Sequence, residues 1–137
     1  MKLHPYLILS GQAANALKFY ENALGLKIGY TQTYKESPMP TTSDQENWLI
    51  HGELLLHNRC FMMIADSPDS EKVSSNVLHL SLNFDEESTM RQTFENLAIG
   101  GRITQPLAHQ FWGALYGQLV DKFGVYWMVN CDLKSNN

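Results

Sequence analysis

The sequence predicts an α+β fold built from two tandem βαβββ modules, residues 1–66 and residues 77–133, within one domain spanning residues 1–137. Two observations support this prediction. Apolar segments typical of strands surround one amphipathic helical segment, and this order occurs twice along the chain. The two halves also share identical residues at a constant spacing, which indicates an internal duplication.

The first module begins with an apolar strand at residues 4–10, which ends at Gly11. A helix follows over residues 12–24, because its apolar residues recur at spacings of three and four and therefore share one face. Proline, serine and acidic residues indicate a loop at residues 35–47. The remaining strands are expected at residues 26–34, 48–56 and 60–65.

A polar segment at residues 67–76 separates the modules, and the second module starts with a strand at residues 77–84. Three acidic residues, 85–87, suit a helix N-terminus, where the macrodipole favours negative charge. This helix is expected to reach Ile99, before two glycines. The last strands are expected at residues 102–107, 113–121 and 125–131, with a tight turn at residues 122–124.

The repeat has a spacing of 75 residues over the first half of each module, where seven of 26 aligned positions are identical. This spacing pairs His4 with His79. In the final strands a spacing of 66 pairs Met62 with Met128. If a pseudo-two-fold axis relates the modules, the two histidines face one another across a shared cavity.

Composition and charge exclude several classes of protein. The net charge is −4, the pI is about 5.6, and no run of Lys or Arg occurs, so we expect no nucleic-acid partner. The apolar stretch near the N-terminus is too short for a membrane span, so we expect a cytoplasmic protein with no membrane partner. The sequence contains no Gly-rich phosphate loop, nucleophile elbow, CxxC pair or HExxH motif.

The first strand of each module carries candidate functional residues on one face, because side chains alternate along a strand. His4 and Tyr6 share a face in the first module, as do His79 and Ser81 in the second. Opposed imidazoles can ligate a divalent metal or exchange protons near neutral pH. Alternatively, each histidine is a hydrogen-bonded wall residue.

The later strands add further candidates, each with a structural alternative. Glu53 shares a strand face with His51, and this carboxylate is either solvated at a sheet edge or functional with a perturbed pKa. Trp112 either packs in a core strand pair with its aromatic neighbours or covers a ligand. The remaining candidates line either a core or a cavity: Met62, Met128 and Tyr116.

Four segments resemble a known family: HPYLILSGQAANALKFYENALG, IHGELLLHNRCFMMIAD, LHLSLNF and FWGALYGQLVDKFGVYWMVN. They are similar to the PhnB-like branch of the vicinal oxygen chelate superfamily, which includes glyoxalase I, bleomycin-resistance proteins and dihydroxybiphenyl dioxygenase. The resemblance implies a curved mixed sheet around a cavity, in a homodimer.

Metal-binding members of this superfamily supply a histidine from the first strand and a glutamate from the last strand of each module. The resemblance therefore implies His4 and His79 as metal ligands, while Met62 and Met128 occupy the glutamate positions. Two histidines alone make a weak site for Zn, Mn, Ni or Fe. We therefore expect no cofactor. If a metal were bound, His51, Glu53 or Asp66 would replace the missing glutamates as ligands.

The sequence thus predicts a protein that binds a small molecule without a catalytic metal. A demethylubiquinone methyltransferase is not expected, since no glycine-rich loop for a methyl donor follows a strand. The alternative is a divalent-metal-dependent lyase, isomerase or dioxygenase with Glu53 as a catalytic base. The expected ligand-binding residues are His4, Tyr6, His51, Met62, His79, Ser81, Trp112, Tyr116 and Met128.

Overall fold

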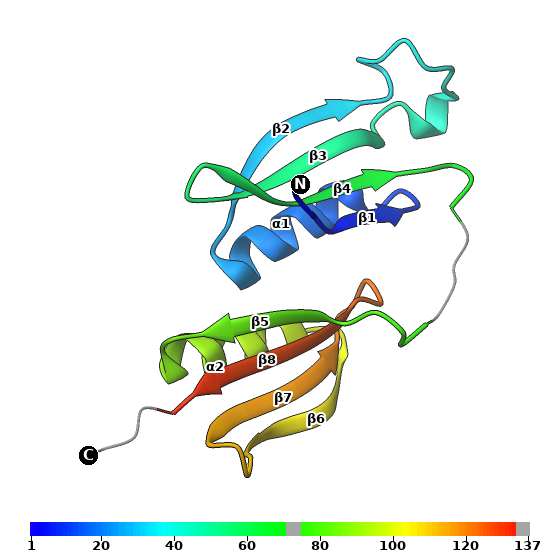
Figure 1. The fold of residues 1–137 in the computed structure, drawn as a ribbon. Coiled ribbons are helices and arrows are strands. Elements are labelled where there is room, and N and C mark those ends of the chain that lie inside the picture. Colours follow the sequence, from blue (N-terminus) through cyan, green and yellow to red (C-terminus); the bar gives the residue numbers. More distant parts are fainter. Residues whose placement is uncertain (71–74, 134–137) are drawn as a thin grey trace. The chain divides into compact units, whose positions relative to one another are not determined.

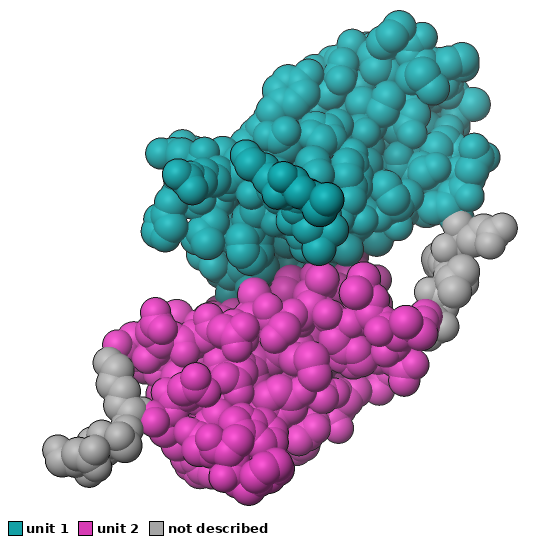
Figure 2. All heavy atoms as spheres, in the orientation of Figure 1, with its two compact units in different colours: residues 1–72 teal, residues 73–137 magenta. Residues whose placement is uncertain are grey.

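A computed structural model describes residues 1–70 and 75–133 and contains the same element order twice (Figure 1). The chain divides into two compact units, Met1–Lys72 and Val73–Asn137 (Figure 2). The first contains β1 (Tyr6–Leu9), α1 (Ala13–Leu24), β2 (Lys27–Thr33), a 3₁₀ helix (Ser43–Gln45), β3 (Leu49–Leu56) and β4 (Arg59–Asp66). The second contains β5 (Leu80–Phe84), α2 (Glu87–Ala98), β6 (Arg102–His109), β7 (Ala114–Val120) and β8 (Tyr126–Asp132).

Each unit forms its own four-stranded mixed sheet. The strand orders are β1-β4-β3-β2 and β5-β8-β7-β6, so the two units have the same topology. In both sheets the first strand pairs parallel with the last, and the other neighbours are antiparallel. The predicted α+β fold with two βαβββ modules is therefore confirmed.

Each helix packs on one face of its own sheet. Helix α1 contacts β3 and β4, and α2 contacts β7 and β8. Glycines allow close approach at equivalent strand positions: a β-carbon at Gly52 would lie 2.8 Å from Cδ1 of Leu17, and one at Gly117 would lie 3.0 Å from Cε2 of Phe94. Within the described ranges, neither helix is long and apolar enough to cross a membrane.

Asp66 holds the first unit together at the end of β4. Its carboxylate is buried and accepts hydrogen bonds from the backbone amides of Ala13 and Leu49, each at 3.0 Å. One oxygen thereby satisfies an amide at the start of α1, where helix N–H groups lack helical partners. Asp66 is thus a structural residue, and its two carboxylate oxygens are both occupied.

Asp121 has a similar role in the β7–β8 turn. Its buried carboxylate accepts hydrogen bonds from the amides of Phe123 at 2.8 Å and Val125 at 3.1 Å, and from the indole N–H of Trp127 at 2.8 Å. These residues belong to the segment that most specifically resembles the PhnB-like branch. That part of the motif therefore stabilises a turn.

The structure corrects the placement of the two histidines within strands. Strand β1 begins at Tyr6 and β5 at Leu80, so His4 and His79 precede their strands. Pro5 lacks an amide hydrogen and enters the parallel pairing only through its carbonyl, which accepts from the Met63 amide at 3.0 Å. Most other helix and strand boundaries lie within about two residues of the predicted ones. Residues 71–74 of the polar segment predicted at 67–76 lie outside the described residues.

The register also corrects the predicted equivalence of Met62 and Met128. Tyr6 pairs with Met63, and its counterpart Ser81 pairs with Met128, so the spacing between the last strands is 65 residues rather than 66. Met62 instead pairs with Leu54 and is fully buried. A shift of one residue moves a strand side chain to the opposite face of the sheet. The identity of Met62 and Met128 therefore does not make them structurally equivalent.

Candidate functional site

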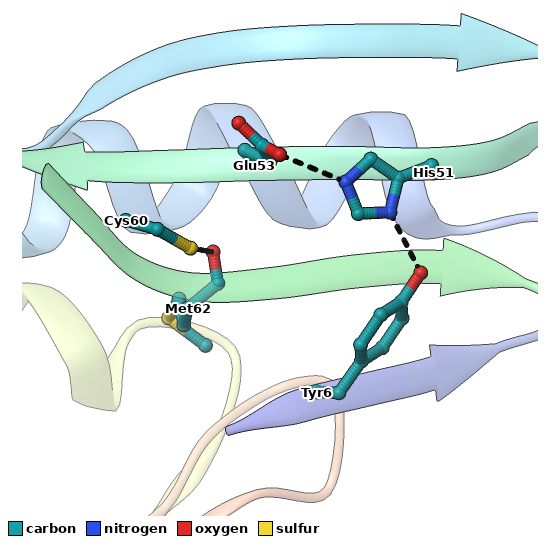
Figure 3. A network of polar contacts seen from close by, with 5 residues as sticks. All are labelled: Tyr6, His51, Glu53, Cys60 and Met62. Carbon is teal, nitrogen blue, oxygen red and sulfur yellow. Dashed lines mark hydrogen bonds and ion pairs between the residues drawn. The ribbon is translucent and has the colours of Figure 1, made fainter. Parts of the chain in front are cut away.

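Tyr6, His51 and Glu53 form a continuous polar network in the first unit (Figure 3). The Tyr6 hydroxyl lies 2.8 Å from Nδ1 of His51, and Nε2 of His51 lies 3.1 Å from Oε1 of Glu53. Tyr6 and Glu53 both pair with Met63, which places them in one row across β1, β4 and β3. His51 lies two residues from Glu53 on β3 and therefore on the same face.

This network lies on the face of the sheet opposite α1. Gly52 and Leu54 alternate with the network residues along β3, and a β-carbon at Gly52 would meet Leu17 of α1. We call the opposite face, which carries Tyr6, His51, Glu53 and Met63, the open face. The side chains of His51 and Glu53 are 26% and 30% exposed, so the polar groups are partly shielded yet accessible.

A β-bulge on β2 lies opposite Glu53. Between the pairs Ile28–Leu54 and Thr31–Gly52, β2 has two residues, Gly29 and Tyr30, where β3 has one. Bulges redirect side chains and are common beside functional sites. Here the ring centroid of Tyr30 lies 6.3 Å from that of His51.

The directions of the two hydrogen bonds follow from what each group can donate. The Glu53 carboxylate only accepts, so His51 donates its Nε2–H to Glu53; in the neutral imidazole, Nδ1 then accepts the Tyr6 O–H. Burial raises the pKa of Tyr6, and the negative charge of Glu53 raises it further. The phenol therefore stays protonated at neutral pH and is suited to hydrogen bonding rather than to action as a base.

The matching positions of the second unit have a different chemistry. Tyr116 and Gln118 of β7 correspond to His51 and Glu53, and the Gln118 amide donates to the Tyr116 hydroxyl at 2.8 Å. The Trp112 ring contacts Tyr116 edge to face, with centroids 5.6 Å apart, and its N–H donates to Asn130 at 3.4 Å. Asn130 in turn donates to the carboxylate of Asp132 at 3.2 Å, so the carboxylate of this cluster lies on β8 and not on the third strand.

The structure brings together three of the residues predicted from the sequence: Tyr6, His51 and Glu53. Met62 lies in the core of the first unit, on the face that α1 covers. His79, which packs its ring on Tyr126 at 5.2 Å, lies in the second unit with Ser81, Trp112, Tyr116 and Met128. Their roles as ligand contacts, like that of His4, stay predictions.

Sequence analysis missed Tyr30 and Met63 on the open face. The signal for Tyr30 was Gly29, since an isolated glycine inside a strand often marks a bulge. Met63 follows only from the pairing of β4 with β1.

The donor groups of the described residues do not fit the divalent-metal site that the family resemblance implies. Among residues 1–70 and 75–133, no group of three or more His, Cys, Asp or Glu side chains is arranged to hold a metal ion. The corrected register puts the thioethers of Met63 and Met128 beside the first strands, and these soft donors suit Zn, Mn or Fe poorly. Both nitrogens of His51 are already hydrogen-bonded. No cofactor is established.

The duplicated βαβββ topology, with one helix on each mixed sheet, is the architecture of glyoxalase-like proteins. Residues 2–129 match the family model of the Glyoxalase/Bleomycin resistance protein/Dioxygenase superfamily. The chain therefore belongs to this superfamily, and the resemblance found in its motifs is confirmed.

Individual relatives support this assignment over nearly the whole chain. Protein YjdN of Escherichia coli K12 is 29% identical over 140 residues, covering 95% of both proteins. The structure of PA1353 from Pseudomonas aeruginosa has 31% identity and a TM-score of 0.85, covering 98% of this chain and 99% of that one. A Bacillus cereus PhnB protein, described as a putative 3-demethylubiquinone-9 3-methyltransferase, has 26% identity and a TM-score of 0.80, covering 96% of this chain and 99% of that one.

Proposed function

We propose that this chain binds a small, partly aromatic organic molecule on the open face of its first module, without a catalytic metal. The observation that carries the proposal is the Tyr6–His51–Glu53 network, which places a few oriented polar groups among apolar and aromatic side chains. Small-molecule sites typically combine such a surface with a small number of well-placed polar groups. The protein is expected to act as a cytoplasmic homodimer.

The neighbouring side chains support binding of an aromatic body. Tyr6 is 42% exposed, Ile8 51% and Tyr30 60%, and all three lie on strands β1 and β2 of the first sheet. Tyrosine rings offer a large contact area at a low cost in conformational entropy. The hydrogen bond to Tyr6 and the contact with Glu53 together hold the His51 ring in one orientation, so a ligand meets a preorganised surface.

A fragment screen on the full chain tests this proposal, with thermal shift as the first readout and NMR chemical shifts as the second. We expect aromatic fragments to perturb Tyr6, His51 and Tyr30; a ligand at 100 times its Kd should add about 2.7 kcal/mol to the free energy of unfolding. His51→Ala should weaken binding, while His109→Ala, the same substitution at an exposed position of β6 in the second module, serves as the matched control. The proposal would be contradicted if no fragment binds, or if the fragments that bind have the same affinity for the His51→Ala variant.

A divalent-metal-dependent lyase, isomerase or dioxygenase is the second candidate. The hydrogen bond between Glu53 and His51 favours it, because it orients a carboxylate that a base would need. Elemental analysis of protein purified without chelator separates the two candidates. One equivalent of Zn, Mn, Ni or Fe that disappears in His4→Ala and His79→Ala would support the metal enzyme and overturn the metal-free proposal.

A further inference from the structure

We propose that the ligand of the open face carries a protonated amine, which Glu53 binds close to the rings of Tyr6 and Tyr30 that flank His51. This inference rests on the proposed function and names the chemical class of its ligand. Three features of the described residues lead to it: the kind of hydrogen-bonding groups left for a ligand, the uncompensated charge of Glu53, and the position of the two aromatic rings.

The groups left for a ligand are hydrogen-bond acceptors. With neutral His51, the Tyr6 O–H is directed to Nδ1 and the Nε2–H is directed to Glu53, so both donors of the network are already used. The Tyr6 oxygen keeps lone pairs, and Oε2 of Glu53 has no hydrogen-bond partner among the described residues. A ligand that brings N–H donors complements this arrangement, whereas a ligand that brings only acceptors does not.

Among the described residues, the charge of Glu53 is not paired with a lysine or an arginine. Its ion pair within these ranges is with His51 alone. Its negative charge reaches other strands, because it helps to raise the pKa of Tyr6 on β1 and of Cys60 on β4, after burial in both cases. The net charge of the chain is −4, so its overall charge does not repel a cationic ligand.

Two tyrosine rings flank the imidazole near Glu53. The ring centroids of Tyr6 and Tyr30 lie 5.8 Å and 6.3 Å from that of His51, and both tyrosines are substantially exposed. The negative faces of such rings attract an ammonium group, by about 0.5–2 kcal/mol for each favourable contact. A carboxylate bonded to an imidazole that two aromatic rings flank therefore favours an organic cation over a neutral or anionic analogue of the same shape.

Three probes of nearly equal size test this inference: 2-phenylethylamine, 2-phenylethanol and 3-phenylpropionate. Their affinities are measured by NMR titration of the full chain, following the signals of Tyr6, Tyr30 and His51. We expect the amine to bind at least about tenfold more tightly than the alcohol, and the carboxylate to bind least. Glu53→Gln, which preserves side-chain shape, should abolish the preference for the amine.

Glu95→Gln is the matched control, because it removes the same charge from an exposed position on α2. It should leave the preference unchanged. Equal or tighter binding of the alcohol or the carboxylate, or a preference that survives Glu53→Gln, would overturn the inference while leaving the proposed function intact. If none of the three probes binds but the fragment screen yields other ligands, the inference also fails; an empty screen removes the proposed function itself.

Discussion

The two modules share a backbone plan but carry different chemistry at matching positions. On the third strand of each sheet, two residues spaced by two form a polar contact: His51 with Glu53 in the first module, and Tyr116 with Gln118 in the second. The first pair contains a carboxylate and an imidazole, and the second contains neither. The comparison teaches that the repeated topology supplies a scaffold, while individual side chains decide which module pairs a carboxylate with an imidazole on this strand.

The modules also use different buried carboxylates to hold their strands. Asp66 satisfies two backbone amides in the first module. The position that matches Asp66 in the second module is Cys131, since Leu9 pairs with Asp66 and Phe84 with Cys131. There the buried carboxylate is Asp121, in the turn before β8. The same fold is therefore stabilised at different points of the chain.

The largest expected effect comes from removing these carboxylates. Asp121→Ala leaves three donors without their acceptor and should lower the free energy of unfolding by about 3–4 kcal/mol, and Asp66→Ala, with two donors, by about 2–3 kcal/mol. Urea denaturation measures both. The exposed Asp69→Ala should change stability by less than about 0.5 kcal/mol. Equal losses for all three variants would show that the buried contacts contribute little.

A smaller loss is expected at the matching glycines under the helices. Gly52→Ala and Gly117→Ala each place a methyl group against a helix side chain and within 3.1 Å of a backbone carbonyl oxygen. Overpacking of this kind costs about 1–3 kcal/mol. Thermal unfolding of the two variants tests whether helix and sheet approach equally closely in both modules. If only one of the two variants is destabilised, the two glycine positions are not structurally equivalent.

The smallest expected effect is electrostatic and confined to the first module. Because the Glu53 charge is the second cause, after burial, of the raised pKa of Tyr6, Glu53→Gln should lower that pKa without returning it to its ordinary value. Ultraviolet titration of tyrosinate, with Tyr6→Phe to identify the signal, measures the change. Glu95→Gln should leave the titration unaltered, and a similar decrease there would indicate a general effect of net charge.

The same shift has a consequence for stability at high pH. A folded-state pKa above the unfolded value means that the folded protein retains the Tyr6 proton longer. The associated stability is fully present below the unfolded pKa of about 10 and is lost as pH rises through the folded pKa. Tyr6→Phe should therefore show a shallower decline in stability across that interval, as measured by urea denaturation at several pH values.

Local patterns in the sequence were sufficient for much of the fold and for part of the candidate site. The spacing of apolar residues predicted the first helix, and acidic residues 85–87 followed by two glycines predicted the second. Two-residue alternation placed His51 and Glu53 on one strand face. Alternation did not establish the face of Met62, because that depends on how β4 pairs with β1 and β3. The predicted strand positions of His4 and His79 were wrong for a similar reason, since a strand begins where its partner provides hydrogen bonds.

The sequence by itself determined the order of elements and the residue types available for chemistry, because these depend on neighbours within a few positions along the chain. It also showed the duplication, because identical residues recur at a constant spacing. Only the tertiary structure decided that Tyr6 meets His51 across 45 residues, that a bulge brings Tyr30 beside them, and that Met63 rather than Met62 shares their face. These features depend on register between distant strands, where a shift of one residue exchanges the two faces of a sheet.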